Sequence, residues 1–192
     1  MRNQETEGLI GFLNSISRYC SIGDTDHAQL LIAQVVDYLR YKHNREHQIV
    51  PLESEINAAE RLFEIYRARF GEQFTATVDV GPGTGGAFVP HYTVMTFVEN
   101  AVYHAFVARD PEWRVEVTVR DVAGGVEVCV RDNGKGFDVD EERHWTAERR
   151  ALYGSMASTT ARFDEYFRGA AEIHVRSRPA EGTAVTFVAP RG

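Results

Sequence analysis

An acid and two glycines follow a valine-rich segment, at a spacing that suits recognition of a flat, amine-bearing ring. Valines alternate from Val126 to Val130, which predicts a buried strand, and Asp132, Gly134 and Gly136 come directly after it. A carboxylate at the open end of a strand can accept a hydrogen bond from an exocyclic amine. Glycines adopt positive φ and carry no Cβ, so a ring can approach the backbone. On its own, this Asp-x-Gly-x-Gly pattern is also explained by a plain hairpin turn.

Two further pairs of residues change the interpretation. Glu99 and Asn100 lie upstream in a segment with helical periodicity, and Gly182 and Thr183 lie downstream, before the last strand-like segment. Together with the Asp132 stretch, in this order, they indicate a nucleotide site. Each pair also has a simpler explanation: a solvated helix face for Glu99-Asn100, and an ordinary strand position for Thr183.

The first part of the chain predicts two helices between Glu5 and Arg45. Apolar residues recur at helical spacing on both sides of the turn at 21–24, and Asp24 or Thr25 can cap the second helix. Two short amphipathic helices joined by a tight turn form a hairpin. Its apolar stripes predict either packing on a second copy of itself or packing on its own domain.

The rest of the chain predicts a mixed sheet with helices on one face, an α+β sandwich, after a polar linker at 44–48. We divide the chain into a hairpin at 1–48 and an α+β domain at 49–192. The expected elements are a helix from Val50 to a stop at Gly71, a strand at 74–80, a glycine-rich loop at 81–86, a helix from Pro90 to about 107, a strand hairpin at 115–119 and 126–130, a charged lid at 139–150, a helix at 155–167 and strands at 173–175 and 183–187.

Composition narrows the function classes. A net charge of −7 over 192 residues argues against general nucleic-acid binding. There is no apolar run of roughly 18 residues that would span a membrane, and the polar start does not resemble a signal peptide. Cys20 and Cys129 form neither a metal-ligand spacing nor a disulfide framework. We therefore expect a cytoplasmic protein.

The motifs, taken in order, resemble LytS/YehU-type sensor histidine kinases, whose ATP-binding domain belongs to the GHKL class (gyrase, Hsp90, histidine kinase, MutL). The resemblance spans almost the whole chain. It implies a two-layer GHKL sandwich, ATP and Mg²⁺ as cofactors, a homodimer, and a response regulator or other signalling protein as partner. The segments that carry it are Leu13–Ile16, Leu39–Tyr41, Val50–Leu52 with Glu53 and Glu55, Tyr66–Gly71, Val98–Ala101 with His104, Asp132–Phe137 and Gly182-Thr183.

The resemblance also implies roles for individual residues. Asn100 would hold Mg²⁺ between the nucleotide phosphates, because a hard cation takes oxygen ligands. Glu99, beside it, would be the catalytic residue that orders water or accepts a proton. Asp132 would accept from the adenine amine. The other nucleotide-binding residues would be Gly134 and Gly136 framing the ring, Thr183 completing the pocket, and Gly154 near a helix start, where free amides favour an anion.

Three departures from the family bear on activity. The family's phosphoacceptor histidine corresponds to Glu7, and the first histidine of the chain is His27. Tyr103 replaces the lysine of the family's N box, which removes a cation that would face phosphate. The second glycine box is reduced to 153–158, with Gly154 as its one glycine. Self-phosphorylation on histidine is therefore not expected of this chain.

Three functions are compatible with these residues. The first is a histidine-kinase-like ATP-binding signalling protein of the two-component type, which we adopt. The second is a pseudokinase, a dimeric adaptor that docks a signalling partner without phosphoryl transfer. The third is a stand-alone GHKL ATPase or an anti-sigma-like serine kinase, which the N-terminal hairpin disfavours. Glu7 favours the second over the first, and nucleotide binding separates them.

Overall fold

The computed structural model describes residues 2–44, 49–107, 112–138 and 147–191, and its main body is a mixed sheet covered on one face by helices. Five strands lie in the order β2-β4-β5-β7-β6. β2 runs parallel to β4, and the remaining neighbours are antiparallel. Their bounds are Phe74–Val80 for β2, Trp113–Val122 for β4, Gly125–Asp132 for β5, Ile173–Arg178 for β6 and Gly182–Ala189 for β7.

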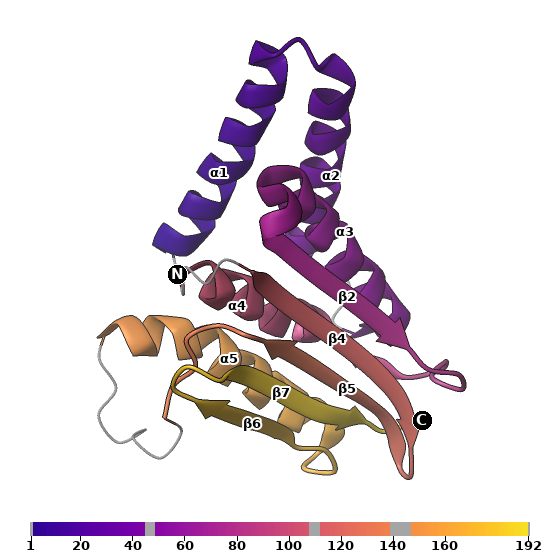
Figure 1. The fold of residues 1–192 in the computed structure, drawn as a ribbon. Helices are drawn as coiled ribbons and strands as arrows, with labels where there is room; N and C mark the ends of the chain where they lie inside the picture. Colours follow the sequence, from indigo (N-terminus) through magenta and orange to yellow (C-terminus); the bar gives the residue numbers. More distant parts are fainter. Residues whose placement is uncertain (1, 45–48, 108–111, 139–146, 192) are drawn as a thin grey trace.

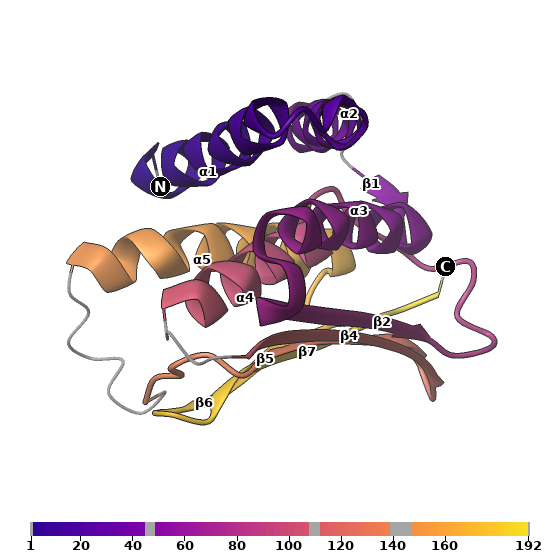
Figure 2. The ribbon, with the colours of Figure 1, turned by 45° about the horizontal axis from the view of Figure 1, so that its top comes forward.

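Three helices form the second layer: α3 (Leu52–Phe70), α4 (Thr93–Val107) and α5 (Ala147–Phe167), all on the same face of the sheet (Figure 2). Inward-facing valines of β4 and β5 alternate with outward-facing polar residues, so the covered face is apolar and the other face is open to solvent. Large side chains from the helices complete the core: Phe63, Phe97 and Phe163 are fully buried, as is Phe187 of β7. The α+β sandwich predicted from the sequence is confirmed.

The N-terminal helices α1 (Arg2–Ser21) and α2 (Thr25–His43) form the expected hairpin. Asp24 caps α2, because its carboxylate accepts from the backbone N–H of His27 at 3.2 Å. The hairpin lies over the helical layer, on the side away from the sheet, and its turn projects from the body (Figures 1 and 2). Phe12, Leu31 and Val35 bury its inner side in the core that includes α3.

Several predicted boundaries are confirmed. The strand at 74–80 coincides with β2. Gly71 ends α3 with a positive φ of +57°, which glycine adopts without strain. The hairpin of β4 and β5 and the last two strands lie where alternation placed them.

Three boundaries differ from the prediction. The segment expected to begin α3 instead forms the short strand β1 (Ile49–Pro51), which pairs antiparallel with β3 (Phe88–Pro90). Pro90 therefore ends a strand, and α4 begins at Thr93. The helix expected at 155–167 begins at Ala147, so it takes in the last residues of the expected lid. The remainder of that lid, 139–146, lies outside the described residues, as does most of the expected linker. None of the described helices is both long and apolar enough to cross a membrane.

Candidate functional site

Asp132 lies at the end of β5, at the base of the glycine-containing stretch. Its side chain is buried, and its Oδ1 accepts from the backbone N–H of Gly134 at 2.8 Å. A backbone hydrogen bond from Thr183, its partner across the β5–β7 pairing, also stabilises the carboxylate. Burial outweighs both hydrogen bonds and raises the pKa of Asp132 to about 6. The protein thus holds a carboxylate at an apolar strand end, ionised at neutral pH and available as an acceptor.

Hydrogen bonds centred on Ser177 of β6 join the glycine stretch to the last two strands. The Ser177 hydroxyl lies 3.0 Å from the hydroxyl of Thr183 and donates to the carbonyl of Gly182 at 3.0 Å. It also accepts from the backbone N–H of Phe137 at 2.9 Å. These contacts bring the Asp132 stretch and Thr183 together, as the sequence predicted. Ser177 itself was missed, because no motif marks it.

Two glycines permit the backbone to approach itself closely here. Gly136 has φ of +55°, and a Cβ on it would lie 1.8 Å from the carbonyl oxygen of Arg178. Gly182 has φ of +82°, and a Cβ on it would lie 2.0 Å from the carbonyl oxygen of Asp132. Both conformations are ones that residues with a side chain rarely adopt. Gly134, two residues before Gly136, is buried.

Asn100 lies on α4, which packs on β4, β5 and β7. Its Nδ2 is buried, and among the described residues it has no hydrogen-bond partner. A buried, unsatisfied amide costs free energy, so its retention calls for a functional explanation. Such an explanation would be a ligand that accepts a hydrogen bond from the Asn100 amide nitrogen and carries a cation that binds the Asn100 amide oxygen.

Glu99, the neighbour of Asn100, has its carboxylate occupied by other side chains. It accepts hydrogen bonds from the hydroxyls of Tyr38 and Tyr92, and Lys42 Nζ lies 3.0 Å from its Oε1. Two of these three partners belong to α2 in the N-terminal hairpin. The expectation that Glu99 acts as a proton acceptor stays a prediction. The sequence reasoning missed its partners, although Tyr38 and Lys42 share a helix face at i and i+4.

The remaining predicted residues lie on α4 and α5. Tyr103 is partly buried on α4, and His104 follows it in the same helix. Gly154 lies inside α5, about two turns from its start. The expectation that it sits near a helix start is therefore wrong, because an amide at that depth is used within the helix. A role for Gly154 in nucleotide binding stays a prediction.

The residues of this site fit a magnesium-bound adenine nucleotide. Asp132 offers an acceptor to the adenine amine, and the two positive-φ glycines let the backbone segments around it pack closely. Within the described ranges, no three His, Cys, Asp or Glu side chains converge as a metal site. A cation beside Asn100 would therefore take most of its oxygen ligands from phosphate, which is how Mg²⁺ is commonly held.

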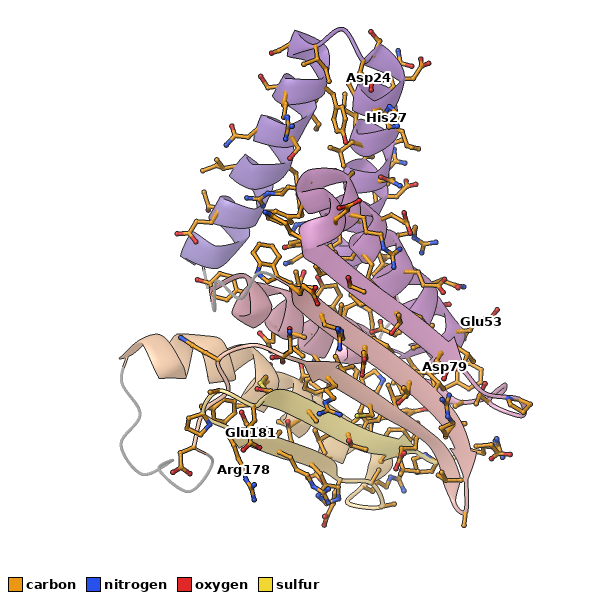
Figure 3. All side chains as sticks on the ribbon, in the orientation of Figure 1. Asp24, His27, Glu53, Asp79, Arg178 and Glu181 are labelled. Atoms are coloured by element: carbon orange, nitrogen blue, oxygen red, sulfur yellow. The ribbon has the colours of Figure 1, made fainter. Side chains whose placement is uncertain are left out.

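The two candidate acceptor positions lie on the hairpin. Glu7 is exposed on α1. His27 lies near the turn, where its Nδ1 is 2.8 Å from the carboxylate of Asp24. Figure 3 shows Asp24 and His27 together at one extremity of the molecule, well separated from Arg178 and Glu181, which border the glycine stretch.

Comparison with known proteins finds two family models. Residues 90–192 match the model described as histidine kinase-, DNA gyrase B-, and HSP90-like ATPase, and residues 9–74 match a model described as histidine kinase. The first match covers more than half of the chain. It includes Asn100, Asp132 and Thr183.

Curated relatives and solved structures agree with these matches. Sensor protein LytS of Bacillus anthracis is 29% identical over 95% of this chain, and LytS of Bacillus subtilis is 26% identical over 95%. The chain spans about a third of the length of these relatives. The catalytic domain of histidine kinase ThkA superposes with a TM-score of 0.55 at 15% identity, covering 76% of this chain and 99% of that domain. The mycobacterial sensor histidine kinase MprB gives 0.51 at 20% identity, covering 75% and 97%.

Proposed function

Because the chain belongs to the histidine kinase-, DNA gyrase B-, and HSP90-like ATPase family, we propose that it is an ATP-binding signalling protein of the histidine-kinase, two-component type. The observation that carries this proposal is Asp132, a buried carboxylate at the end of β5, where two nearby glycines have no room for a side chain. Relatives at 26–29% identity named as sensor proteins support the signalling role.

In this proposal each site residue contacts a defined part of the bound nucleotide. Asp132 accepts from the adenine amine, and Gly134, Gly136 and Thr183 shape the space around the ring. Asn100 holds the cation with its amide oxygen and leaves its buried amide N–H for a phosphate oxygen. The Mg²⁺ ion, when bound, supplies charge neutralisation for the phosphates.

We further propose that this chain does not phosphorylate itself on histidine. Phosphoryl transfer requires an acceptor in line with the γ-phosphate, and small misplacements cost orders of magnitude in rate. The family's acceptor position holds Glu7, which offers no ring nitrogen. His27 lies at the hairpin turn, away from the glycine stretch (Figure 3). Tyr103 in place of a lysine also removes a charge that would stabilise the transferring phosphoryl group.

Two measurements test this function. Calorimetric titration with an ATP analogue and Mg²⁺ should show binding, and the absence of both heat and a thermal shift at millimolar nucleotide would refute the proposal. Incubation with γ-labelled ATP should leave the chain without acid-labile phosphate. Base-stable, acid-labile label that disappears in His27→Ala would show that His27 is the acceptor.

A variant with a restored acceptor separates a kinase module from a pseudokinase. Glu7→His places an imidazole at the family's acceptor position, on an exposed site of α1 that tolerates substitution. Acid-labile label in this variant, but not in wild type, would mean that only the acceptor is missing. Nucleotide binding without label in either protein would favour the adaptor, whose work is to dock a partner.

Assembly follows from the hairpin's outer surface. Among the described residues, most of the large apolar side chains that remain exposed lie on α1, α2 and their turn: Ile10, Leu13, Ile22, Leu30, Ile32 and Val36. Exposed apolar side chains concentrated on one element of a fold are typical of an interaction site. We propose a homodimer through this surface, with a response regulator or another signalling protein as the further partner, in the cytoplasm. The docking of the hairpin on α3 disfavours a stand-alone ATPase or anti-sigma-like kinase.

A further inference from the structure

One side of α2 carries three polar side chains that contact the ATPase domain. They are Tyr38, Tyr41 and Lys42, here called the α2 polar face, and they lie at i, i+3 and i+4 on the helix. Their partners are two carboxylates, Glu99 and Glu55. Neither the nucleotide pocket nor the apolar packing of the hairpin uses these contacts.

The contact with Glu99 lies next to the proposed cation ligand. Tyr38 donates to the Glu99 carboxylate, and Lys42 Nζ reaches both of its oxygens, at 3.0 and 3.2 Å. The Lys42 side chain is only 13% exposed and that of Glu99 26%, so water screens this pair weakly. Glu99 immediately precedes Asn100 in α4. Because adjacent residues of a helix move together, a displacement of Glu99 also displaces Asn100.

The contact with Glu55 fixes the start of the same helix. Glu55, on α3, is fully buried, and its carboxylate accepts from the Tyr41 hydroxyl. It also accepts from the backbone N–H of Tyr92 at 2.7 Å and of Met95 at 3.1 Å. An acidic side chain that takes up unpaired amides at a helix N-terminus stabilises that end.

Tyr92 joins the two contacts. It has φ of +67°, a conformation uncommon for residues other than glycine, just before α4 begins. Its backbone N–H is held by Glu55 and its hydroxyl by Glu99. A strained backbone conformation of this kind persists only where several surrounding contacts hold it, and such residues cluster at functional sites.

We propose that Glu99 and Glu55 are positioning residues, through which the α2 polar face sets the placement of α4 and so the nucleotide affinity of Asn100. This proposal rests on the proposed function, because it concerns the same nucleotide site. The hairpin and the nucleotide then share one coupling free energy. If a shift of α2 changes nucleotide affinity by some factor, then by linkage nucleotide binding changes the equilibrium between the two placements of α2 by the same factor.

Polar contacts suit this task better than apolar ones. Burying a carboxylate is costly unless hydrogen bonds offset the cost, so Glu55 and Glu99 add little stability compared with well-packed apolar residues of similar volume. Their hydrogen bonds are directional, however, and they are lost when α2 shifts by a small distance. An apolar contact would tolerate the same shift.

A conservative substitution on the hairpin tests the proposal. Tyr38→Phe removes one hydroxyl that contacts Glu99 and leaves the pocket residues unchanged. We expect nucleotide affinity, measured by calorimetry with an ATP analogue and Mg²⁺, to fall by about 5-fold or more, as for typical coupling between sites. Glu99→Gln should also weaken binding, and the double variant should match the larger single effect instead of their product.

Tyr19→Phe is the matched control. It makes the same change in the same hairpin, where the Tyr19 hydroxyl donates to the carbonyl of Ala68 in α3 at 2.9 Å. This variant should retain wild-type affinity. Equal losses in Tyr38→Phe and Tyr19→Phe would overturn the proposal in favour of general hairpin loosening. Unchanged or tighter binding in Tyr38→Phe would overturn it as well.

A second readout does not depend on nucleotide. Hydrogen exchange of the backbone amides at the start of α4 should speed up in Tyr38→Phe and stay at the wild-type rate in Tyr19→Phe. If wild type binds no nucleotide, the proposed function fails, and the exchange rates still decide whether the α2 polar face positions α4. Unchanged exchange in Tyr38→Phe would refute the coupling.

Discussion

Replacing Asp132 with asparagine is expected to stabilise the fold while weakening nucleotide binding. Burial raises the pKa of Asp132 from 3.8 to about 6. At about 1.4 kcal/mol per pKa unit, the ionised side chain costs the folded protein about 3 kcal/mol at pH 7 relative to a neutral one. Gly134 and Thr183 donate backbone hydrogen bonds to the Asp132 carboxylate, and an asparagine side chain has only one oxygen to accept them. Its amide N–H group therefore faces one of these two donors. That donor then loses its acceptor at a cost of about 1–3 kcal/mol, so the net gain in the free energy of unfolding should be at most about 2 kcal/mol.

The pH dependence follows from the sign of the shift. Between pH 3.8 and about 6 the folded protein binds more protons at Asp132 than the unfolded chain does. This group's contribution to the free energy of unfolding therefore falls as pH rises through that window. The variant lacks this titration, so urea unfolding should give similar stabilities near pH 4 and a more stable variant at pH 7.

Nucleotide affinity should move in the opposite direction. Loss of the charged acceptor should weaken binding by about 1–3 kcal/mol, roughly 5- to 150-fold, in calorimetry at pH 7. Wild-type affinity should itself fall as pH drops through about 6, where Asp132 becomes protonated. Asp79→Asn, at an exposed ion pair with Arg120, serves as the control and should change both quantities little (Figure 3).

Two outcomes would refute this reasoning. A variant that is less stable at pH 7 would mean that the hydrogen bonds of Asp132 outweigh its burial. A variant with wild-type affinity would mean that Asp132 does not contact the base.

Three further predictions concern the frame of the site and its assembly. Gly136→Ala should destabilise by at least about 2 kcal/mol in urea unfolding, because its Cβ would lie 1.8 Å from the carbonyl oxygen of Arg178; wild-type stability would mean that this backbone relaxes freely. Glu55→Ala should cost about 3 kcal/mol or more by the same measurement, since it leaves buried backbone amides at the start of α4 unpaired; a loss below about 1 kcal/mol would argue against that anchoring role. Leu13→Asp, on an exposed apolar position of α1, should shift light scattering from dimer to monomer, and a wild-type protein already monomeric at high concentration would contradict the proposed dimer.

Local patterns predicted most of the sheet. Alternation in β4 and β5 fixes which face is buried, since a one-residue slip would turn every valine outward. The cap at Asp24 and the stop at Gly71 are equally local, because both depend on residues within one turn. The order of motifs also predicted a candidate nucleotide site, and the structure brings two of its residues, Asp132 and Thr183, into register.

The parts that sequence reasoning missed depend on partners far away in the chain. β1 and β3 are three residues each, and they form because Val50 and Val89 pair across the fold. Local propensity at Pro90 favoured a helix start, and this pairing overrides it. The contact between Tyr38 and Glu99 spans 61 residues. Spacing placed Tyr38 on a helix face, but only tertiary structure shows which carboxylate it meets.

The pairing of β2 with β4 bears on how the chain is made. Strands β4, β5, β7 and β6 pair antiparallel with one another and all lie in the C-terminal half of the chain. Strand β2 pairs in parallel with β4, and α4 connects the two in sequence. About 110 residues separate the end of β2 from the end of β7. At synthesis rates of roughly 5–20 residues per second, the hairpin, α3 and β2 leave the ribosome about 5–20 s before their sheet can be completed. During that interval α3 and β2 contact each other but lack the native cover that α4 and β4 later provide. Nascent chains stalled before β4 should therefore be the species that chaperones bind.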